Sequence, residues 1–139
     1  IESIPRNLPY LKCAPNEITE ALLTVLVNAI EAVVKDCEPN NRRIRIEIEH
    51  IDGKIVIAIS DNGNGVSSEI EDRIFDPFFT TKEVGSGSGL GLSSARGLVE
   101  KHSGSITLQT GGGLTCFRVV IPCEAAGLAE NLANSSTAA

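Results

Sequence analysis

An acidic residue followed by alternating glycines, Asp61-Asn62-Gly63-Asn64-Gly65, stands directly after an apolar segment of this 139-residue chain. Isoleucine occupies every second position from 55 to 59, as on one face of a half-buried strand. If the alternation continues, Asp61 lies on the isoleucine side, where a carboxylate is costly unless a hydrogen-bond donor reaches it. The exocyclic amine of a base is a suitable donor, and Gly63 and Gly65 let the backbone turn tightly past a flat ligand. The motif therefore predicts a nucleotide site.

A second glycine-rich run, at residues 85–91, leads directly into a segment in which Leu92, Ala95 and Val99 recur at helical spacing. The free N–H groups and the dipole of a helix N-terminus favour an anion such as a triphosphate. Taken alone, the run is equally well explained as a flexible linker. The glycine patterns of dinucleotide-binding folds and of P-loops are both absent, which disfavours Rossmann and P-loop architectures.

The polar edge of a predicted long helix carries a third candidate, Asn28. Pro15 suits the first turn of this helix, and apolar residues recur with helical spacing to about Asp36. A neutral amide oxygen can join phosphate oxygens and waters around Mg²⁺, which needs few protein ligands. A solvated asparagine is the commoner state for such a residue, so Asn28 gains weight only beside the other motifs.

The elements that would position these residues are mostly strands. Alternating isoleucines from 44 to 48 and the turn residues Asp52-Gly53 predict a β-hairpin with the isoleucine strand before Asp61. Ser67 or Ser68 can begin a short helix that ends at about Ile74. Strands at about residues 105–109 and 114–121 are joined by three glycines, and residues 9–13 could form a further short strand.

Four elements, in this order, resemble the N, G1, F and G2 boxes of the ATP-binding catalytic domain of two-component sensor histidine kinases: Asn28-Ala29-Ile30-Glu31-Ala32, Asp61-Asn62-Gly63-Asn64-Gly65, Phe75-Asp76-Pro77-Phe78-Phe79-Thr80-Thr81-Lys82 and Gly87-Ser88-Gly89-Leu90-Gly91-Leu92. Residues 115–122 resemble the closing strand of the family, so the resemblance covers about residues 9–122. Each box is modest, but coincidence does not account for four of them in order and at the right spacing. The phenylalanine-rich run is particular to histidine kinases within the superfamily of gyrase, mismatch-repair and chaperone ATPases.

The resemblance implies an α/β two-layer sandwich, in which a mixed β-sheet of about five strands is covered on one face by about three helices. ATP would lie between helices, beneath a mobile lid that spans about residues 75–88. We expect residues 1–123 to form this catalytic domain. Residues 124–139 are rich in Ala, Asn and Ser and have no strand pattern, so we expect a flexible or disordered tail.

The cofactors implied by the resemblance are ATP and Mg²⁺. By similarity, Asn28 would coordinate Mg²⁺, and Asp61 would accept a hydrogen bond from the adenine amino group. Lys82 would reach the phosphates from the lid, so that Asn28 and Lys82 are the expected catalytic residues. The other expected contacts shape the base pocket, belong to the lid or cradle the phosphates: Gly63, Gly65, Phe79, Gly87, Gly89, Leu90, Gly91 and Thr115.

The reaction implied is transfer of the γ-phosphoryl group of ATP to a histidine imidazole. Neither His50, after a strand, nor His102, at a helix end, has the sequence context of the family's phosphoacceptor. Both are expected to be structural or solvent-facing. We therefore expect the acceptor on a histidine-containing dimerisation domain of the same parent protein, with a response regulator as the indirect partner.

Thr24 departs from the family pattern, because histidine kinases usually carry asparagine one turn before Asn28 and their ATP-hydrolysing relatives carry an acid. Threonine does not act as a general base at neutral pH, so hydrolysis is the weaker expectation. Glu31 and Glu20 lie near the same polar edge, and it stays open whether one of them orients water or the acceptor. Two other functions stay open. A serine kinase of the anti-sigma type would label a serine on a partner protein, and a docking module that has lost catalysis would bind ATP without phosphorylating an acceptor.

Composition limits the partners and the compartment. The formal net charge of -6 and the absence of a dense Lys/Arg block argue against nucleic-acid binding. The four cysteines form no CxxC pair, which is typical of reduced thiols in the cytosol. No run approaches the length of a membrane span. We expect a cytoplasmic, monomeric domain whose parent protein could be membrane-anchored.

Overall fold

The computed structural model describes residues 4–81 and 89–123, and a long helix organises them. This helix, α1, extends over Pro15–Asp36 and carries Glu17 in its first turn, where a negative charge interacts favourably with the helix dipole. Its buried positions recur at three- and four-residue steps: Ile18, Ala21, Val25, Ala29 and Val33. The predicted helix is confirmed at both ends.

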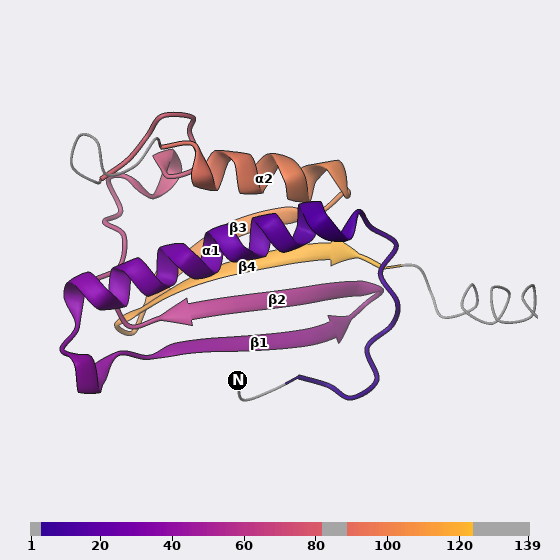
Figure 1. Cartoon of the computed structure of the whole chain (residues 1–139), viewed down its shortest axis with the longest axis horizontal. Coiled ribbons are helices and arrows are strands. Elements are labelled where there is room, and N and C mark those ends of the chain that lie inside the picture. Colours follow the sequence, from indigo (N-terminus) through magenta and orange to yellow (C-terminus); the bar gives the residue numbers. More distant parts are fainter. Residues whose placement is uncertain (1–3, 82–88, 124–139) are drawn as a thin grey trace, which may run out of the picture.

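Four antiparallel strands form the sheet: β1, Ile44–Ile51; β2, Lys54–Asp61; β3, Ser105–Gly111; and β4, Leu114–Pro122. Their order is β1-β2-β4-β3, so that β2 and β4 are central (Figure 1). Both hairpins turn through two residues at positive φ, Asp52-Gly53 and Gly112-Gly113, as type I′ turns require. The register places Asp61 at the end of β2 opposite Thr115 of β4.

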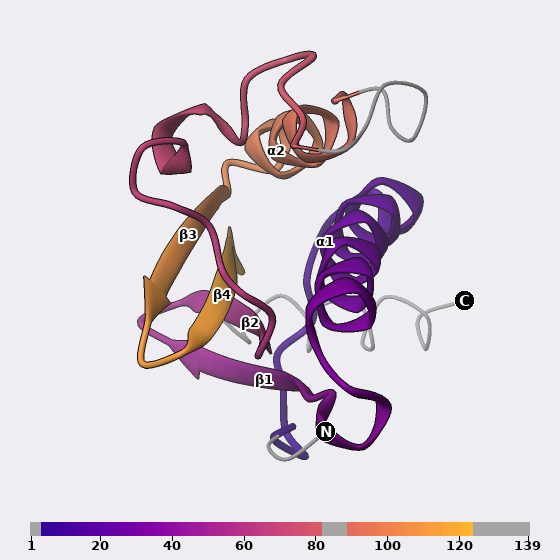
Figure 2. The ribbon, with the colours of Figure 1, turned by 90° about the vertical axis from the view of Figure 1, so that its left-hand side faces the viewer.

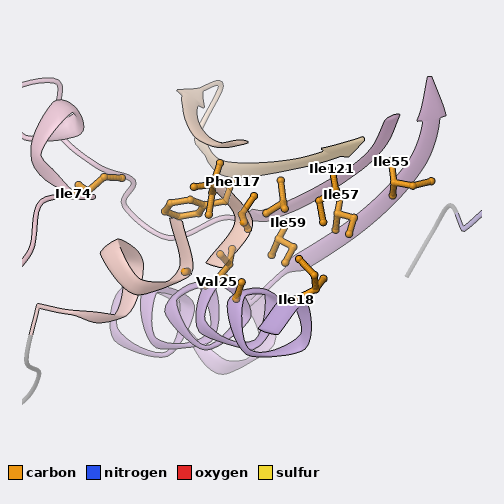
Figure 3. Close-up of a cluster of buried hydrophobic side chains, with 14 residues drawn as sticks. Ile18, Val25, Ile55, Ile57, Ile59, Ile74, Phe117 and Ile121 are labelled. Carbon is orange, nitrogen blue, oxygen red and sulfur yellow. The ribbon is translucent and has the colours of Figure 1, made fainter. Parts of the chain in front are cut away.

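One hydrophobic core fills the space between the helices and the sheet. The second helix, α2, covers Gly91–Lys101 and lies beside α1 on the same face of the sheet (Figure 2). Val25 of α1 packs towards Phe117 of β4, and the two side chains are 0% and 1% exposed (Figure 3). Burial of a side chain of this kind stabilises a fold by roughly 1.5–3 kcal/mol. The core therefore fixes both helices over the central strands.

The sheet differs in detail from the prediction. The expected mixed sheet of about five strands is, within the described residues, an antiparallel sheet of four. Residues 9–13 form no strand; Pro9 has no N–H for a ladder, and Leu11 and Cys13 instead pack against the core from an irregular segment. The predicted layered α/β architecture is confirmed.

The helices also differ from the prediction. Instead of about three, the described residues contain two α-helices and two single turns of 3₁₀-helix, at Pro39–Asn41 and Glu71–Arg73. The helix predicted at residues 67–74 is wrong. The Glu71 N–H makes one i→i−4 bond to the Ser67 carbonyl, but the bonds from the Arg73 N–H to Ile70 and from the Asp76 N–H to Arg73 are i→i−3, as in a 3₁₀-helix.

Two predicted features lie outside the described residues. They are the part of the lid at residues 82–88 and the tail at residues 124–139, so lid mobility and the domain boundary stay predictions. Within the described ranges, no helix is long and apolar enough to cross a membrane.

Candidate functional site

A cavity of about 800 Å³ lies along one side of α1. Its other walls come from residues in the segments 65–81 and 89–92 and from Phe117 of β4. The lining of α1 extends from Asn16 to Asp36, and its part between Thr24 and Asp36 is roughly 18 Å long at the helical rise of 1.5 Å per residue. The volume is typical of small-molecule sites, and the length admits a base, a sugar and a phosphate chain in line.

Two buried polar side chains lie behind one end of this cavity. Asp61 is 1% exposed and Thr115 is 4% exposed, and they are register partners on β2 and β4. The Gly63 N–H donates to Asp61 Oδ1 at 2.9 Å, but no described residue bonds to Asp61 Oδ2 or to Thr115 Oγ1. Buried polar atoms without partners are costly, and native proteins rarely keep them without a reason. A ligand that offers a donor and an acceptor on one edge, as adenine does, would satisfy both atoms.

Burial and charge set the protonation of this carboxyl group. Burial raises the pKa of Asp61, the hydrogen bond from Gly63 opposes the rise, and the negative charge of Asp36 adds to it. A donor from a ligand would favour the ionised form and lower the pKa again. The described residues therefore supply a hydrogen-bond donor to one oxygen of the Asp61 carboxylate and none to the other.

The glycines of the loop are required by space at one position and by backbone conformation at the other. A Cβ atom at position 63 would lie 3.0 Å from both Ala32 Cβ and Asp61 Oδ1. Gly65 has a φ of 80°, which favours glycine, and a Cβ there would lie 3.6 Å from Thr115 Oγ1. Gly65 lines the cavity, so it separates Thr115 from the open space.

The opposite end of the cavity is formed around the start of α2. Gly89 has a φ of 68°, and a Cβ there would lie only 2.4 Å from the Phe78 carbonyl carbon. The same two residues are joined by a 2.9 Å hydrogen bond from the Phe78 N–H to the Gly89 carbonyl. Gly91 begins α2 and lines the cavity, so the N-terminal N–H groups of that helix are close to it.

Asn28 and Thr24 face the same end from α1. Asn28 is half-buried in the lining, whereas the Thr24 hydroxyl donates to the Glu20 carbonyl at 3.0 Å. A Cβ on Gly91 would lie 3.4 Å from Thr24 Cγ2, so Thr24 presents its methyl group towards α2. No cluster of three or more His, Cys, Asp or Glu side chains suited to a metal occurs among the described residues. The amide of Asn28 together with phosphate oxygens and waters would fit Mg²⁺, which keeps much of its hydration.

The phenylalanine-rich segment is anchored to the core and to α2. Phe75 packs edge-on against Phe117, with ring centroids 6.2 Å apart, and the Arg96 guanidinium lies 5.5 Å from the Phe75 ring. Phe79 lines the cavity and has the Arg73 guanidinium 4.8 Å from its ring centroid. These contacts hold the segment that closes one side of the cavity.

The predicted site residues fall into three groups. Asn28, Gly65, Phe79, Gly89 and Gly91 line the cavity. Four other predicted site residues that the structure describes do not line the cavity. Asp61, Gly63 and Thr115 lie behind its wall, and Leu90, which is 40% exposed, directly precedes α2. Lys82 and Gly87 lie outside the described residues.

The cavity lining also contains four charged residues that were not among the predicted site residues: Glu20, Glu31, Lys35 and Asp36. Of these, Asp36 lies at the very end of the predicted helix and is the one that sequence reasoning missed altogether. A carboxylate in the last turn of α1 interacts unfavourably with the helix dipole. Because such unfavourable placements are expected at functional sites, this one could have pointed to Asp36 as a site residue. Asp36 Oδ2 accepts a hydrogen bond of 2.9 Å from the N–H of Asn64, which lies between Gly63 and Gly65 in the loop after Asp61.

Known proteins resemble this chain over most of its length. The family model described as histidine kinase-, DNA gyrase B- and HSP90-like ATPase matches residues 14–125. The two-component sensor PprA of Pseudomonas aeruginosa is 35% identical over 123 residues, which are 87% of this chain and 13% of that protein. The histidine-protein kinase AtoS of Escherichia coli is 35% identical over 130 residues, which are 91% of this chain and 20% of that protein. The catalytic domain of the histidine kinase ThkA has a TM-score of 0.69 at 32% identity, and the match covers 81% of this chain and 70% of that chain.

The chain belongs to the family of histidine kinase-, DNA gyrase B- and HSP90-like ATPases. Within this family it is an ATP-binding catalytic domain of the sensor histidine kinase type, as the resemblance implied. It spans a fifth or less of the length of the two curated relatives, at 13% and 20%.

Proposed function

We propose that this domain binds Mg-ATP in the cavity beside α1 and transfers the γ-phosphoryl group to a histidine on a dimerisation domain of the same parent protein. The observation that carries the proposal is the buried pair of unpartnered atoms, Asp61 Oδ2 and Thr115 Oγ1. Adenine presents an amino donor beside a ring nitrogen acceptor, so one edge of the base would satisfy both. Asp61 would then fix the base, with Gly63 and Gly65 allowing the loop to approach its face.

The opposite end of the cavity would hold the phosphates. The backbone at Gly89 and Gly91 and the N-terminal dipole of α2 would stabilise their negative charge. Asn28 would offer its amide oxygen to Mg²⁺, and bound Mg²⁺ supplies charge neutralisation on the transferring phosphoryl group. Gly87 and Lys82 stay predicted phosphate contacts from the lid.

The acceptor histidine is proposed to come from outside this chain. Both ring nitrogens of His102 have partners, because Nε2 accepts from the Ala14 N–H at 3.0 Å and Nδ1 lies 2.9 Å from the Leu98 carbonyl. His50 pairs with Ile55, six residues and roughly 20 Å along β2 from Asp61. Neither imidazole is therefore positioned to attack a phosphate at the start of α2.

Transfer is proposed in preference to hydrolysis because Thr24, not an acid, stands one turn before Asn28. Glu20 and Glu31 also line the cavity, and either could orient water or the acceptor. A threonine whose hydroxyl donates to its own helix cannot take a proton from water at neutral pH. An acceptor imidazole is itself the nucleophile and needs no such base. The response regulator, the cytoplasmic location and the monomeric state of the isolated domain are part of the same proposal, and they follow from a histidine kinase role.

Calorimetric titration of the chain with ATP, with and without Mg²⁺ and with GTP as a comparison, tests the binding step. We expect Mg²⁺ to strengthen ATP binding and GTP to bind more weakly. Asp61→Asn should weaken ATP binding by about 1.5–3 kcal/mol, the scale of a hydrogen bond to a charged group, and reduce the discrimination against GTP. Asp52→Asn, in the exposed turn at the other end of β2, is the matched control and should behave as the unmodified chain.

The transfer step is tested by mixing the chain with labelled ATP and the histidine-containing domain of its parent. Acid-labile, alkali-stable label on that domain is the expected result. Acid-stable label on a serine would support the serine kinase alternative, and ATP binding without label on any supplied acceptor would support a docking module.

A further inference from the structure

The C-terminal end of α1 holds the loop that carries Asp61. Figure 1 shows this end of the helix and the end of β2 on the same side of the molecule. Asp36 Oδ2 accepts from the Asn64 N–H at 2.9 Å, and Cys37 Sγ donates to the Asn62 carbonyl at 3.1 Å. The last residue of α1 and the residue that caps it are therefore each hydrogen-bonded to a residue of the loop.

The remaining loop contacts come from the chain that leads into β1. Asn62 Oδ1 accepts from the Arg43 N–H at 2.8 Å, and Asn62 Nδ2 donates to the Asn41 carbonyl at 2.7 Å. These bonds position the loop without involving the cavity. Asp36 differs from them, because it lines the cavity as well as holding the loop.

The place of Asp36 in α1 is unfavourable on local grounds. Its negative charge stands in the last turn, where the helix dipole disfavours it. The charge also acts on Asp61, a second carboxylate. The other charged side chains that α1 contributes to the cavity lining are Glu20, Glu31 and Lys35. Two carboxylates near one end of a cavity destabilise the free protein and would be offset by a ligand edge that presents donors.

We propose that Asp36 is a positioning and specificity-determining residue of the base site: it holds the wall formed by Gly63 and Gly65 through Asn64, and its charge favours adenine over guanine. The inference rests on the proposed function, because it assumes that a base occupies this end. Adenine carries an amino donor where guanine carries a carbonyl oxygen. A second negative charge near that edge therefore attracts the first base and repels the other.

Two substitutions separate the two roles. Asp36→Asn keeps an oxygen acceptor for the Asn64 N–H but removes the charge, whereas Asp36→Ala removes both. Glu38→Gln is the matched control, because it removes one exposed negative charge beyond the end of α1, outside the cavity lining. The dissociation constants for ATP and GTP are measured for each chain by calorimetry or by competition, with thermal unfolding as the check on folding.

We expect Asp36→Ala to weaken ATP binding by about tenfold, because the loop loses a hydrogen bond to a charged group. Asp36→Asn should keep most of the ATP affinity while the ATP-over-GTP ratio falls roughly threefold, since a charge near the base edge is lost. Glu38→Gln should leave both values unchanged. If Asp36→Ala does not fold, the ratio for Asp36→Asn still decides the electrostatic role.

The pH profile gives a readout that a purely structural role would not change. Asp36 raises the pKa of Asp61, with burial as the larger cause and the Gly63 N–H opposing both. Asp36→Asn should therefore lower the pKa of Asp61 and move the acidic limit of ATP binding to lower pH. An unchanged ATP-over-GTP ratio together with an unchanged pH profile in Asp36→Asn would overturn the proposal. Failure of the unmodified chain to bind ATP would instead overturn the proposed function.

Discussion

In the proposed function, the two ends of the cavity would recognise their parts of a nucleotide in different ways. At the base end, strand register places Asp61 opposite Thr115, so fixed side-chain atoms of a sheet would contact the base. At the phosphate end, the described groups are mainly backbone, held by the close approach of Gly89 to Phe78. We therefore expect substitutions at the base end to change which nucleotide binds. Substitutions at the phosphate end should change whether the phosphates and the metal are held at all.

The largest effect is expected from Gly89→Ala, which tests whether backbone geometry makes the phosphate end. The new Cβ would lie 2.4 Å from the Phe78 carbonyl carbon, at a φ of 68°. Positive φ and overpacking together should lower the free energy of unfolding by about 3 kcal/mol. ATP binding should be lost in the fraction that still folds, as measured by chemical denaturation and calorimetry.

Gly97→Ala is the control for that substitution, because no atom lies within 4 Å of its added Cβ in the middle of α2. It should raise the free energy of unfolding by about 0.5–1 kcal/mol through its helix propensity and leave ATP binding unchanged. Equal effects of the two substitutions would show that the approach of Gly89 to Phe78 does not matter.

The next largest effect is expected from Asn28→Ala, which tests the metal at the phosphate end. Loss of the amide oxygen should weaken ATP binding in Mg²⁺ by about tenfold, or about 1.4 kcal/mol, and leave metal-free binding nearly unchanged. Asn40→Ala, an exposed asparagine beyond the end of α1, is the control. The same Mg²⁺ dependence in all three chains would remove Asn28 from the metal site.

Asp61→Asn, at the base end, is expected to have a smaller effect, on the free energy of unfolding of the ligand-free domain. Burial raises the pKa of Asp61, so the folded state keeps this proton to higher pH than the unfolded state does. The free energy of unfolding should therefore fall as pH rises from the ordinary aspartate pKa through the raised one. Asp61→Asn should remove this fall and be about 1 kcal/mol more stable at neutral pH, because an amide costs less to bury than a carboxylate.

Denaturant titrations at several pH values measure this difference, with Asp52→Asn as the exposed control. The prediction is contradicted if Asp61→Asn and the unmodified chain lose stability in parallel as the pH rises. Together with weaker ATP binding, a more stable variant would show that the buried carboxylate is kept for the ligand and not for the fold.

Much of the base end could be predicted from the sequence, because period-two alternation extends from the isoleucines of β2 to Asp61. The role of Asp36 could not, since it depends on a hydrogen bond to Asn64, 28 residues away. The error at residues 67–74 has a local cause, because a serine suited to begin a helix does not reveal that the turns after it close with i→i−3 bonds. The backbone groups proposed to contact the phosphates are harder to predict from the sequence, because only the glycines indicate where they lie.

The smallest effect is expected from Thr24→Val, which asks whether the phosphate end uses a hydroxyl. The Thr24 hydroxyl donates to the Glu20 carbonyl of its own helix, and its methyl group faces Gly91. Valine keeps the shape and removes only this back-bond, which contributes little to a helix. ATP affinity, with and without Mg²⁺, should therefore change by less than about 0.5 kcal/mol. A loss of Mg²⁺ dependence similar to that expected for Asn28→Ala would mean that the hydroxyl turns towards the metal when ATP binds, and that the phosphate end is rearranged by its ligand while the base end is not.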